Sequence, residues 1–375
     1  MTQRVLILGG QGRIGSHVAE DILAHTQAAI TVTGRRQHQD RTPLTWTKPE
    51  RVQYLPLDLA DQADVERAIA DHELTIHCAG PFGYRDDHAL QACIRQQKNY
   101  IDVADNPQYV QRAFTHREAA QAAGVTAIVS TGIFPGISNS MARQGIEQLD
   151  RADQVHLSYI VAGSGGAGVT VMRTTFLELQ HPFKAWIDGE WRTIQPYSDR
   201  EQVEFPAPYG QCGVYWFNTV EAMTLPAVFP VKTVVTKFGS LPDFYNHLTW
   251  LMAHWIPKPW LRSPKMVEFL AQVSYRMTEV TDRFSGIDIA MRVDITGEKD
   301  GRPARYCSTA AHGDTAIAAG YGTGAIAQLI LAGELQTPGV WPVEQALSTE
   351  LFEKTLKQRG LEIQQGFQLK AGNFS

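Results

Sequence analysis

Short apolar runs alternate along the first 135 residues with segments whose apolar residues recur every three or four positions. A continuous apolar run is typical of a strand buried on both faces, and the longer spacing is typical of an amphipathic helix. Strands that alternate with helices form a parallel sheet through right-handed crossovers. We therefore expect an α/β protein whose N-terminal domain is a Rossmann-type parallel sheet with strand order 3-2-1-4-5-6. The expected strands are Val5–Leu8, Ile30–Thr33, Val52–Leu55, Leu74–Cys78, Asn99–Val103 and Thr126–Ser130.

From about residue 155 the pattern changes, and the segments of strand character are joined by hairpin turns. Asp188-Gly189 and Asp300-Gly301 are two such turn signals. We expect a second α+β domain built on a mostly antiparallel sheet. The expected division is residues 1–135 for the first domain, 136–313 for the second, and 314–375 for a C-terminal helix and tail.

Residues 243–283 have helical spacing and contain Trp250, Trp255 and Trp260. Three tryptophans in one helical segment are consistent with a lid, an apolar substrate wall or a membrane-surface patch. A helical layer over the second sheet, or a subunit interface, is the alternative, and it is the interpretation that we favour.

The composition narrows the class of protein. The 375 residues are enough for two ordinary domains, and a hydrophobic content of 43% predicts a normal globular core. A net charge of -5 without any basic tract argues against non-specific nucleic-acid binding. Cys78, Cys93, Cys212 and Cys307 form no CxxC, and no HExxH or Cys/His cluster is present, so we expect neither a metal site nor a disulfide.

The cellular location is expected from the same features. The first expected strand begins by about residue 4, which leaves no room for a signal peptide. No apolar run reaches the roughly 18 residues that are needed to span a bilayer. Unpaired cysteines suit a reducing compartment, and we therefore expect a cytoplasmic protein.

The first expected strand leads into a glycine-rich turn and then a helix. Gly10, Gly12 and Gly15 form a GxGxxG. In such a turn Gly10 permits the tight bend, Gly12 lets the backbone approach a pyrophosphate, and Gly15 lets the helix pack closely on the strand. Arg13 and Ile14 begin the helix, whose N–H groups and positive dipole end can hold phosphates. The context indicates dinucleotide binding, with a purely structural glycine turn as the alternative.

Arg35 and Arg36 follow the second expected strand. An NAD site usually has Asp or Glu about 20 residues beyond the glycine motif. Arg35 stands there instead, and its guanidinium can pair with a 2′-phosphate and stack on adenine. We therefore expect NADP(H) rather than NAD(H), with two solvated surface arginines as the alternative. Asp58, after the third strand, could accept from the adenine amino group or could equally fix the entry turn of the next helix.

The fourth expected strand ends in a run of small residues, Cys78-Ala79-Gly80-Pro81, before Phe82. Small side chains let the backbone run beside a ribose and pyrophosphate, so we expect these four residues to contact the cofactor. This turn, the following helix with Cys93, and Asn99-Tyr100-Ile101-Asp102 together resemble the saccharopine dehydrogenase-like family of oxidoreductases. Residues 131–139 are similar to that family's crossing into its second domain, and the resemblance covers roughly residues 1–145 well. It returns in the small-residue helix after residue 314 and in residues 338–342.

The resemblance implies hydride transfer between nicotinamide C4 and a small-molecule substrate. Substrates in the family include imines derived from amino acids, carbonyls and activated double bonds. The resemblance also implies a substrate and dimerisation domain, a homodimer, and a C-terminal segment that returns to the first domain. Members of the lysine pathway bind dicarboxylic substrates through basic residues. The basic residues expected in the second domain form no visible cluster here, which argues against saccharopine itself.

Hydride transfer to C=O, C=N or an activated C=C also needs a proton source. Asp102, at the end of the fifth expected strand, is the first candidate, as an acid or a substrate anchor. Tyr84, just after the Gly-Pro turn, is the second. For Asp102 the alternative is a hydrogen bond to the following loop. No Tyr-x-x-x-Lys pair and no GxSxG is present. We expect an NADPH-dependent reductase of a small or moderately apolar metabolite, with a non-catalytic NADP(H)-binding redox sensor as the alternative.

Overall fold

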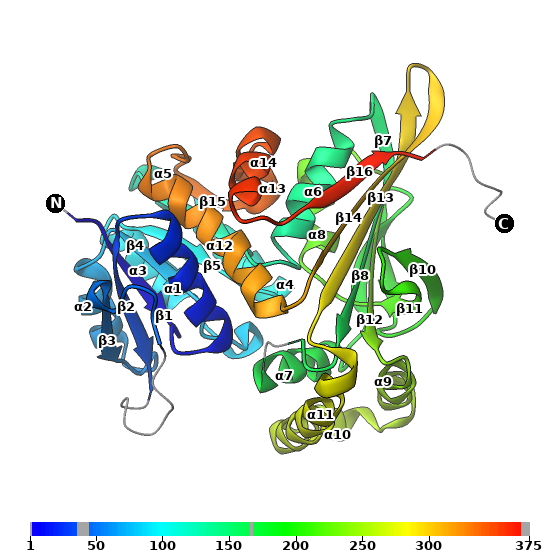
Figure 1. Cartoon of the computed structure of the whole chain (residues 1–375), viewed down its shortest axis with the longest axis horizontal. Helices are drawn as coiled ribbons and strands as arrows, with labels where there is room; N and C mark the ends of the chain where they lie inside the picture. The colour runs from blue at the N-terminus through cyan, green and yellow to red at the C-terminus, as the bar shows by residue number, and fades with distance from the viewer. Residues whose placement is uncertain (1, 36–44, 166–167, 369–375) are drawn as a thin grey trace. The chain divides into compact units, whose positions relative to one another are not determined.

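The computed structural model describes residues 2–35, 45–165 and 168–368, and the chain divides into two compact units (Figure 1). Unit 1 contains Met1–Ile137 and Ala316–Arg359. Unit 2 contains Ser138–Thr315 and Gly360–Ser375. Each unit is therefore assembled from two segments that lie far apart in the sequence.

Unit 1 is built on a parallel sheet of seven strands. Its strands are β1 (Arg4–Leu8), β2 (Ala29–Gly34), β3 (Val52–Pro56), β4 (Leu74–His77), β5 (Asn99–Asp102), β6 (Thr126–Val129) and β15 (Gly339–Pro342). They lie in the order β15-β6-β5-β4-β1-β2-β3, and every neighbouring pair is parallel. The Rossmann-type order expected from the sequence is confirmed. The pattern did not predict β15, which lies beside β6 and comes from the second segment of the unit.

The helices of unit 1 include one that is rich in alanine and glycine, α12. The helices and short 3-10 turns are α1 (Arg13–His25), η2 (Pro49–Arg51), α2 (Gln62–Ala70), η3 (Phe82–Tyr84), α3 (His88–Arg95), α4 (Pro107–Phe114), α5 (Arg117–Ala122), α12 (Thr315–Leu331), α13 (Val343–Ala346) and α14 (Thr349–Gln358). A Cβ on Gly320 would lie 2.9 Å from the backbone carbon of His17, and one on Gly324 would collide with the Asp21 carboxylate. The small residues thus let α12 pack closely along α1 (Figure 1).

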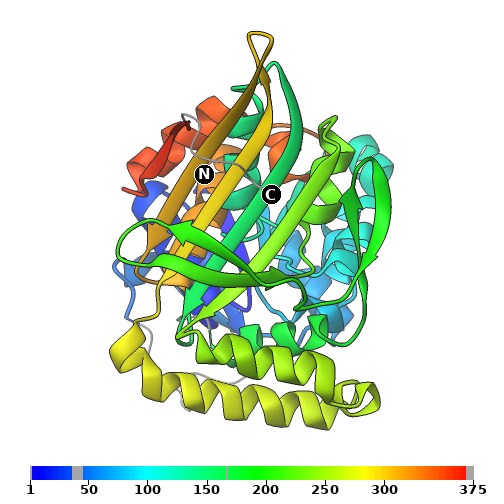
Figure 2. The same ribbon diagram turned by 90° about the vertical axis from the view of Figure 1, so that its right-hand side faces the viewer.

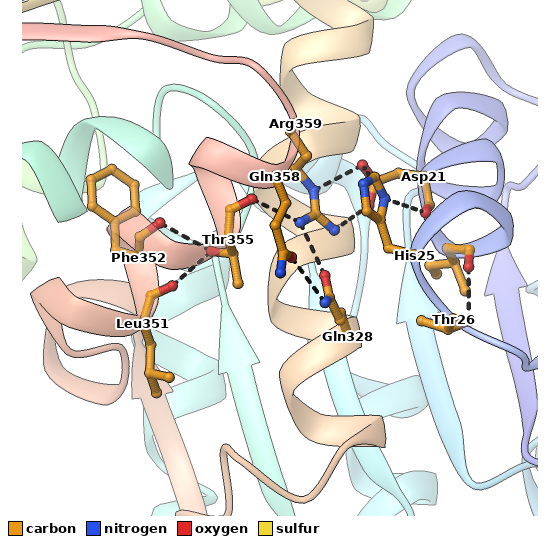
Figure 3. A network of polar contacts seen from close by, with 10 residues as sticks. Asp21, His25, Thr26, Gln328, Leu351, Phe352, Thr355, Gln358 and Arg359 are labelled. Carbon is orange, nitrogen blue, oxygen red and sulfur yellow. Dashed lines mark hydrogen bonds and ion pairs between the residues drawn. The ribbon is translucent and has the colours of Figure 1, made fainter.

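A buried ion pair joins the last helix of unit 1 to the first (Figure 3). Arg359 donates from Nη2 to Asp21 Oδ1 at 2.6 Å and from Nε to Oδ2 at 2.9 Å. Its Nη1 donates to the Thr355 carbonyl and to Gln328 Oε1, each at 3.0 Å. One guanidinium therefore connects α1, α12 and α14 inside the unit.

Unit 2 is built on a second sheet of seven strands, with a separate two-stranded hairpin. Its strands are β7 (Arg151–Ala162), β8 (Phe183–Ile187), β9 (Glu190–Ile194), β10 (Glu201–Phe205), β11 (Gly210–Trp216), β12 (Thr233–Leu241), β13 (Ile289–Lys299), β14 (Arg302–His312) and β16 (Ile363–Phe367). The order is β10-β11-β12-β7-β13-β14-β16, and β12–β7 is the one parallel pair among the described strands of this second sheet. A second α+β domain on a mostly antiparallel sheet is confirmed. The hairpin at Asp188-Gly189 is present as β8 and β9.

The helices of unit 2 include an antiparallel pair at one end of the sheet's strands (Figure 2). They are α6 (Ile137–Ile146), α7 (Val169–Glu178), α8 (Glu221–Val228), α9 (Phe244–Trp255), α10 (Lys258–Leu261) and α11 (Pro264–Ser285). Ala253 of α9 and Val267 and Ala271 of α11 belong to one apolar cluster, together with Phe238 of β12. The Trp-rich segment is helical, as expected, and its inner side packs on unit 2.

Candidate cofactor and active site

The glycine turn after β1 leaves no room for larger side chains. Gly9 has a φ of +77°, and a Cβ there would lie 2.9 Å from the Cα of Ala79. A Cβ on Gly10 would lie 2.7 Å from the Cβ of Val32, and one on Gly15 would collide with the Gly9 carbonyl oxygen. The turn is therefore enclosed by the ends of β1, β2 and β4, where a parallel sheet binds its ligand.

The N-terminus of α1 follows this turn directly. Gly12 is the N-cap residue, and its N–H donates to the Gly9 carbonyl at 2.8 Å. Among the described residues no side chain caps the helix, and its first turn has no acidic residue. The backbone at Arg13 and Ile14 thus presents the positive end of a 13-residue helix, an arrangement suited to phosphate oxygens.

Two arginines lie close to each other beyond the ends of β2 and β4. Arg35 comes directly after Gly34, the last residue of β2, whereas Arg36 lies outside the described residues. Arg85 is half-buried and donates from Nε to the Ala79 carbonyl at 2.7 Å. Burial and the nearby Arg35 guanidinium lower the pKa of Arg85. Because the two cations repel each other, an anion held between them would stabilise both. No sequence signal pointed to Arg85, and it was not among the predicted site residues.

Asp58 lies in the turn that leads from β3 into α2. Its Oδ1 accepts from the Ala60 N–H at 3.1 Å, and its carbonyl accepts from the Asp61 N–H at 3.0 Å. These bonds fit the turn-fixing role that was the alternative for Asp58. The residue is exposed, and its charge acts on Arg85 across the same region.

The small residues after β4 form a compact turn against β1. The Cys78 N–H donates to the Leu8 carbonyl at 2.8 Å, and the Gly80 N–H donates to the Cys78 carbonyl at 3.2 Å. Burial raises the pKa of the Cys78 thiol, which disfavours a thiolate nucleophile. His77 is buried, which lowers its pKa to about 3, and its Nδ1 accepts from the Ala79 N–H at 3.2 Å. A neutral, packed His77 holds the turn and carries no charge near neutral pH.

Asp102 ends β5 as a fully buried carboxyl group. Its Oδ1 accepts from the backbone N–H of Ala104 at 3.0 Å and of Ser130 at 2.8 Å. Its Oδ2 has no hydrogen-bond partner among the described residues. Burial raises the pKa of Asp102 to about 7, although the two N–H donors lower it. Asp102 thus holds two loops at the carboxyl end of the sheet and titrates near neutral pH.

Tyr84 ends η3, just beyond the Gly80-Pro81 turn, and is 54% exposed. The two proton-donor candidates therefore differ sharply in environment, since Asp102 is sealed from solvent and Tyr84 is open to it. No group of three His, Cys, Asp or Glu side chains suited to a metal ion occurs in the described part of the chain.

The comparisons with known proteins match the N-terminal part of the chain to a nucleotide-binding domain. The family model for the saccharopine dehydrogenase NADP binding domain matches residues 5–128. The resemblance to the saccharopine dehydrogenase-like family is confirmed. A carboxynorspermidine synthase of Vibrio cholerae is 25% identical in an alignment of 304 residues that covers 72% of this chain and 72% of that protein. A probable mitochondrial saccharopine dehydrogenase-like oxidoreductase of Arabidopsis thaliana is 25% identical in an alignment of 120 residues that covers 29% of this chain and 26% of that protein.

Two solved structures share the fold of this chain. Apo saccharopine dehydrogenase (L-Glu forming) from Saccharomyces cerevisiae has a TM-score of 0.69 at 14% identity, over 98% of this chain and 100% of that one. A homospermidine synthase from Legionella pneumophila, in complex with NAD, has a TM-score of 0.65 at 11% identity, over 98% of this chain and 92% of that one. The family model and the sequence relatives support an oxidoreductase, and the two structures show the fold. In the described part of the chain no helix is both long and apolar enough to cross a membrane.

Proposed function

We propose that the chain is an NADPH-dependent reductase that transfers hydride to a C=N, C=O or activated C=C bond of a small or moderately apolar metabolite. The observation that carries the proposal is the uncapped N-terminus of α1 behind the glycine turn, with Arg35 at the end of β2. The first feature suits a pyrophosphate, and the second suits a 2′-phosphate in place of the acidic residue of an NAD site.

A C=N bond is the substrate group that we favour. Saccharopine and carboxynorspermidine, which appear in the names of the similar proteins, are secondary amines. Reduction of an imine yields such an amine. We therefore expect the preferred substrates to be imines formed between an amine and a carbonyl compound. Ketones and enones are the substrate classes that we expect next.

Each predicted residue has a role in this proposal. Gly10, Gly12 and Gly15, with the N–H groups at Arg13 and Ile14, hold the pyrophosphate. Arg35 and Arg36 pair with the 2′-phosphate, and Arg85 adds to the positive potential beside them. Asp58 is available to the adenine amino group, and the backbone from Cys78 to Pro81 lines the ribose. When bound, the cofactor supplies the hydride from nicotinamide C4.

Two residues are candidates for the proton source, Asp102 and Tyr84. Asp102, with a pKa of about 7, can give or take a proton at neutral pH, which a general acid requires. Its complete burial and its two backbone donors favour a role in holding the loops that surround the substrate. Tyr84, which is exposed, is the alternative donor to the substrate.

The test of the proposal is a fluorescence titration of the purified apoprotein with NADPH and, separately, with NADH. Arg35→Ser should weaken NADPH binding by about 10- to 100-fold, the value of one charge-assisted phosphate contact, and should leave NADH binding almost unchanged. Arg67→Ser is the matched control, because Arg67 is an exposed arginine of α2 that pairs with Asp64. Equal losses for both cofactors would remove Arg35 from the phosphate site.

A substrate screen then separates the enzyme from the redox sensor. NADPH consumption with any imine, ketone or enone excludes the sensor. Tight NADPH binding without turnover of any class would favour it. Binding of neither cofactor would make the glycine turn purely structural and would end both proposals.

A further inference from the structure

The exposed apolar side chains of the protein gather on one helical segment of unit 2. Of the 14 large hydrophobic side chains that are exposed among the described residues, 11 lie between residues 244 and 284. Solvent-exposed apolar residues are ordinarily scattered singly over a surface. A concentration of this kind marks a surface that binds another protein or a membrane when the protein functions.

Helix α11 presents a continuous apolar stripe to solvent. Phe269, Val273, Met277, Val280 and Phe284 are separated by four, four, three and four residues, so they share one side of the helix. Phe284 is 88% exposed. The stripe therefore lies on the side opposite the buried residues of α11, which pack on unit 2.

Helix α9 presents a second stripe with the same spacing. Phe244, Leu248, Leu251 and Trp255 are separated by four, three and four residues, and Trp255 is 72% exposed. Ala253, on the opposite side of the helix, is buried. This stripe, too, points away from the interior of unit 2.

The two helices lie antiparallel and side by side (Figure 2). The hydroxyl groups of Tyr245, near the start of α9, and Thr281, near the end of α11, are 2.9 Å apart. Ala253, near the end of α9, shares an apolar cluster with Val267, near the start of α11. Because both helices pack on the same cluster, their stripes face outward together, and we call them the apolar helical face.

A row of basic residues borders this face on α11. Lys265, Arg276 and Arg283 are exposed and make no ion pair or hydrogen bond with any described residue. Their positions follow the edge of the apolar stripe at helical spacing. The face therefore carries positive charge along one border, although the whole chain has a net charge of -5.

The carboxylates of the same helix offset this charge only in part. Glu268 accepts two hydrogen bonds from Arg173, at 2.6 and 2.7 Å. Asp282 accepts from the backbone N–H and the hydroxyl of Ser164, at 2.7 and 2.6 Å. These two side chains are held against unit 2, which leaves Glu279 as the remaining acidic side chain of α11.

We propose that the apolar helical face docks on the surface of an anionic phospholipid membrane. Exposed tryptophans suit the headgroup region, apolar side chains suit the upper acyl region, and Lys and Arg at the border are attracted by anionic headgroups. A second copy of the chain is a poorer occupant. Pairing α11 with itself about its middle would bring Arg276 beside Arg276 of the other copy, and like charges would repel.

The test is flotation of the full chain with phosphatidylcholine vesicles that contain or lack phosphatidylglycerol. The chain should float with the anionic vesicles and only weakly with the neutral ones. Val280→Ser with Phe284→Ser should weaken binding to anionic vesicles by about 10-fold or more, because two apolar side chains no longer enter the membrane. Trp191→Ser is the matched control, since Trp191 is an exposed aromatic residue of β9 outside the face, and it should bind as the unaltered chain does.

A second variant tests the charge. Replacing Lys265, Arg276 and Arg283 by Gln should weaken binding to anionic vesicles by about fivefold for each charge and leave binding to neutral vesicles unchanged. Circular dichroism of each variant checks that it is folded. Absence of flotation, or flotation that neither set of substitutions reduces, would overturn the proposal. So would a dimer in light scattering that Val280→Ser with Phe284→Ser converts to a monomer, because the face would then be a self-interface.

Discussion

Asp102 is a carboxyl group whose protonation is coupled to folding. Burial raises its pKa from the ordinary value of 3.8 to about 7. Between these two values the unfolded chain has lost the proton, and the folded chain still holds it. The free energy of unfolding therefore falls as the pH rises through this range, and this contribution is constant above pH 7.

Asp102→Asn should remove this dependence. The amide oxygen can still accept from the Ala104 and Ser130 N–H groups, and the amide has no charge to bury. The free energy of unfolding of the wild type, relative to the variant, should fall by up to about 1.4 kcal/mol per pH unit between pH 4 and 7. Urea unfolding at several pH values measures it, with the exposed Asp58→Asn as the control. Parallel curves for wild type and Asp102→Asn would show that the carboxyl group ionises normally.

At the scale of single residues, the sequence could predict those site residues whose role depends only on their near neighbours in the chain. Gly10, Gly12 and Gly15 could be recognised because a turn, a close approach and a helix start follow one another within a few residues. Arg85 could not, because its importance comes from its hydrogen bond to the Ala79 carbonyl and from the charge of Arg35, which follows a different strand. The complete burial of Asp102 likewise depends on the loops that fold over it.

At the scale of elements, the ion pair between Asp21 and Arg359 holds the end of α14 against α1. Arg359→Ala should destabilise the protein by about 3–5 kcal/mol, because it leaves the Asp21 carboxylate buried without its partner. Urea unfolding should show most of that loss recovered when Asp21→Leu is combined with Arg359→Met, since an apolar pair has no charge to compensate. Arg67→Ala, which breaks an exposed ion pair with Asp64, should change stability by less than about 1 kcal/mol. A loss of that small size for Arg359→Ala would mean that water reaches Asp21.

Elements with a clear period could be predicted, and short or irregular ones could not. The strands of the Rossmann-type sheet and the helices of residues 243–283 agree with the sequence pattern. The strands β15 and β16 do not, because each has only four or five residues and owes its conformation to a partner far away in the sequence. The hairpin of β10 and β11 was also missed, although it contains Val203, Val214 and other buried residues.

At the scale of the whole molecule, unit 1 is completed by its second segment, Ala316–Arg359. In the sequence, most of unit 2 lies between this segment and the first segment of unit 1. The segment Ala316–Arg359 supplies β15, which pairs with β6 and forms the edge of the sheet, and α12, whose glycines pack on α1. It also supplies Arg359, the partner of the buried Asp21. A chain of residues 1–137 alone therefore has an open sheet edge and exposes the side of α1 that α12 covers in the whole protein, and we expect it to aggregate.

Residues 1–137 joined directly to residues 316–359 should fold as an independent unit. Gly322 of α12 packs against the Gly132 carbonyl, so the two ends to be joined belong to neighbouring parts of unit 1. A glycine–serine linker of about 15 residues, with a mean reach of about 20 Å, is sufficient to connect them. The joined chain should unfold cooperatively in urea, and NADPH at 100 times its Kd should raise its stability by about 2.7 kcal/mol. The same chain with Arg359→Ala serves as its control and should be less stable.

If the joined chain aggregates as residues 1–137 alone should, then unit 1 needs unit 2 in order to fold. If it folds without a response to NADPH, then cofactor binding requires residues outside unit 1.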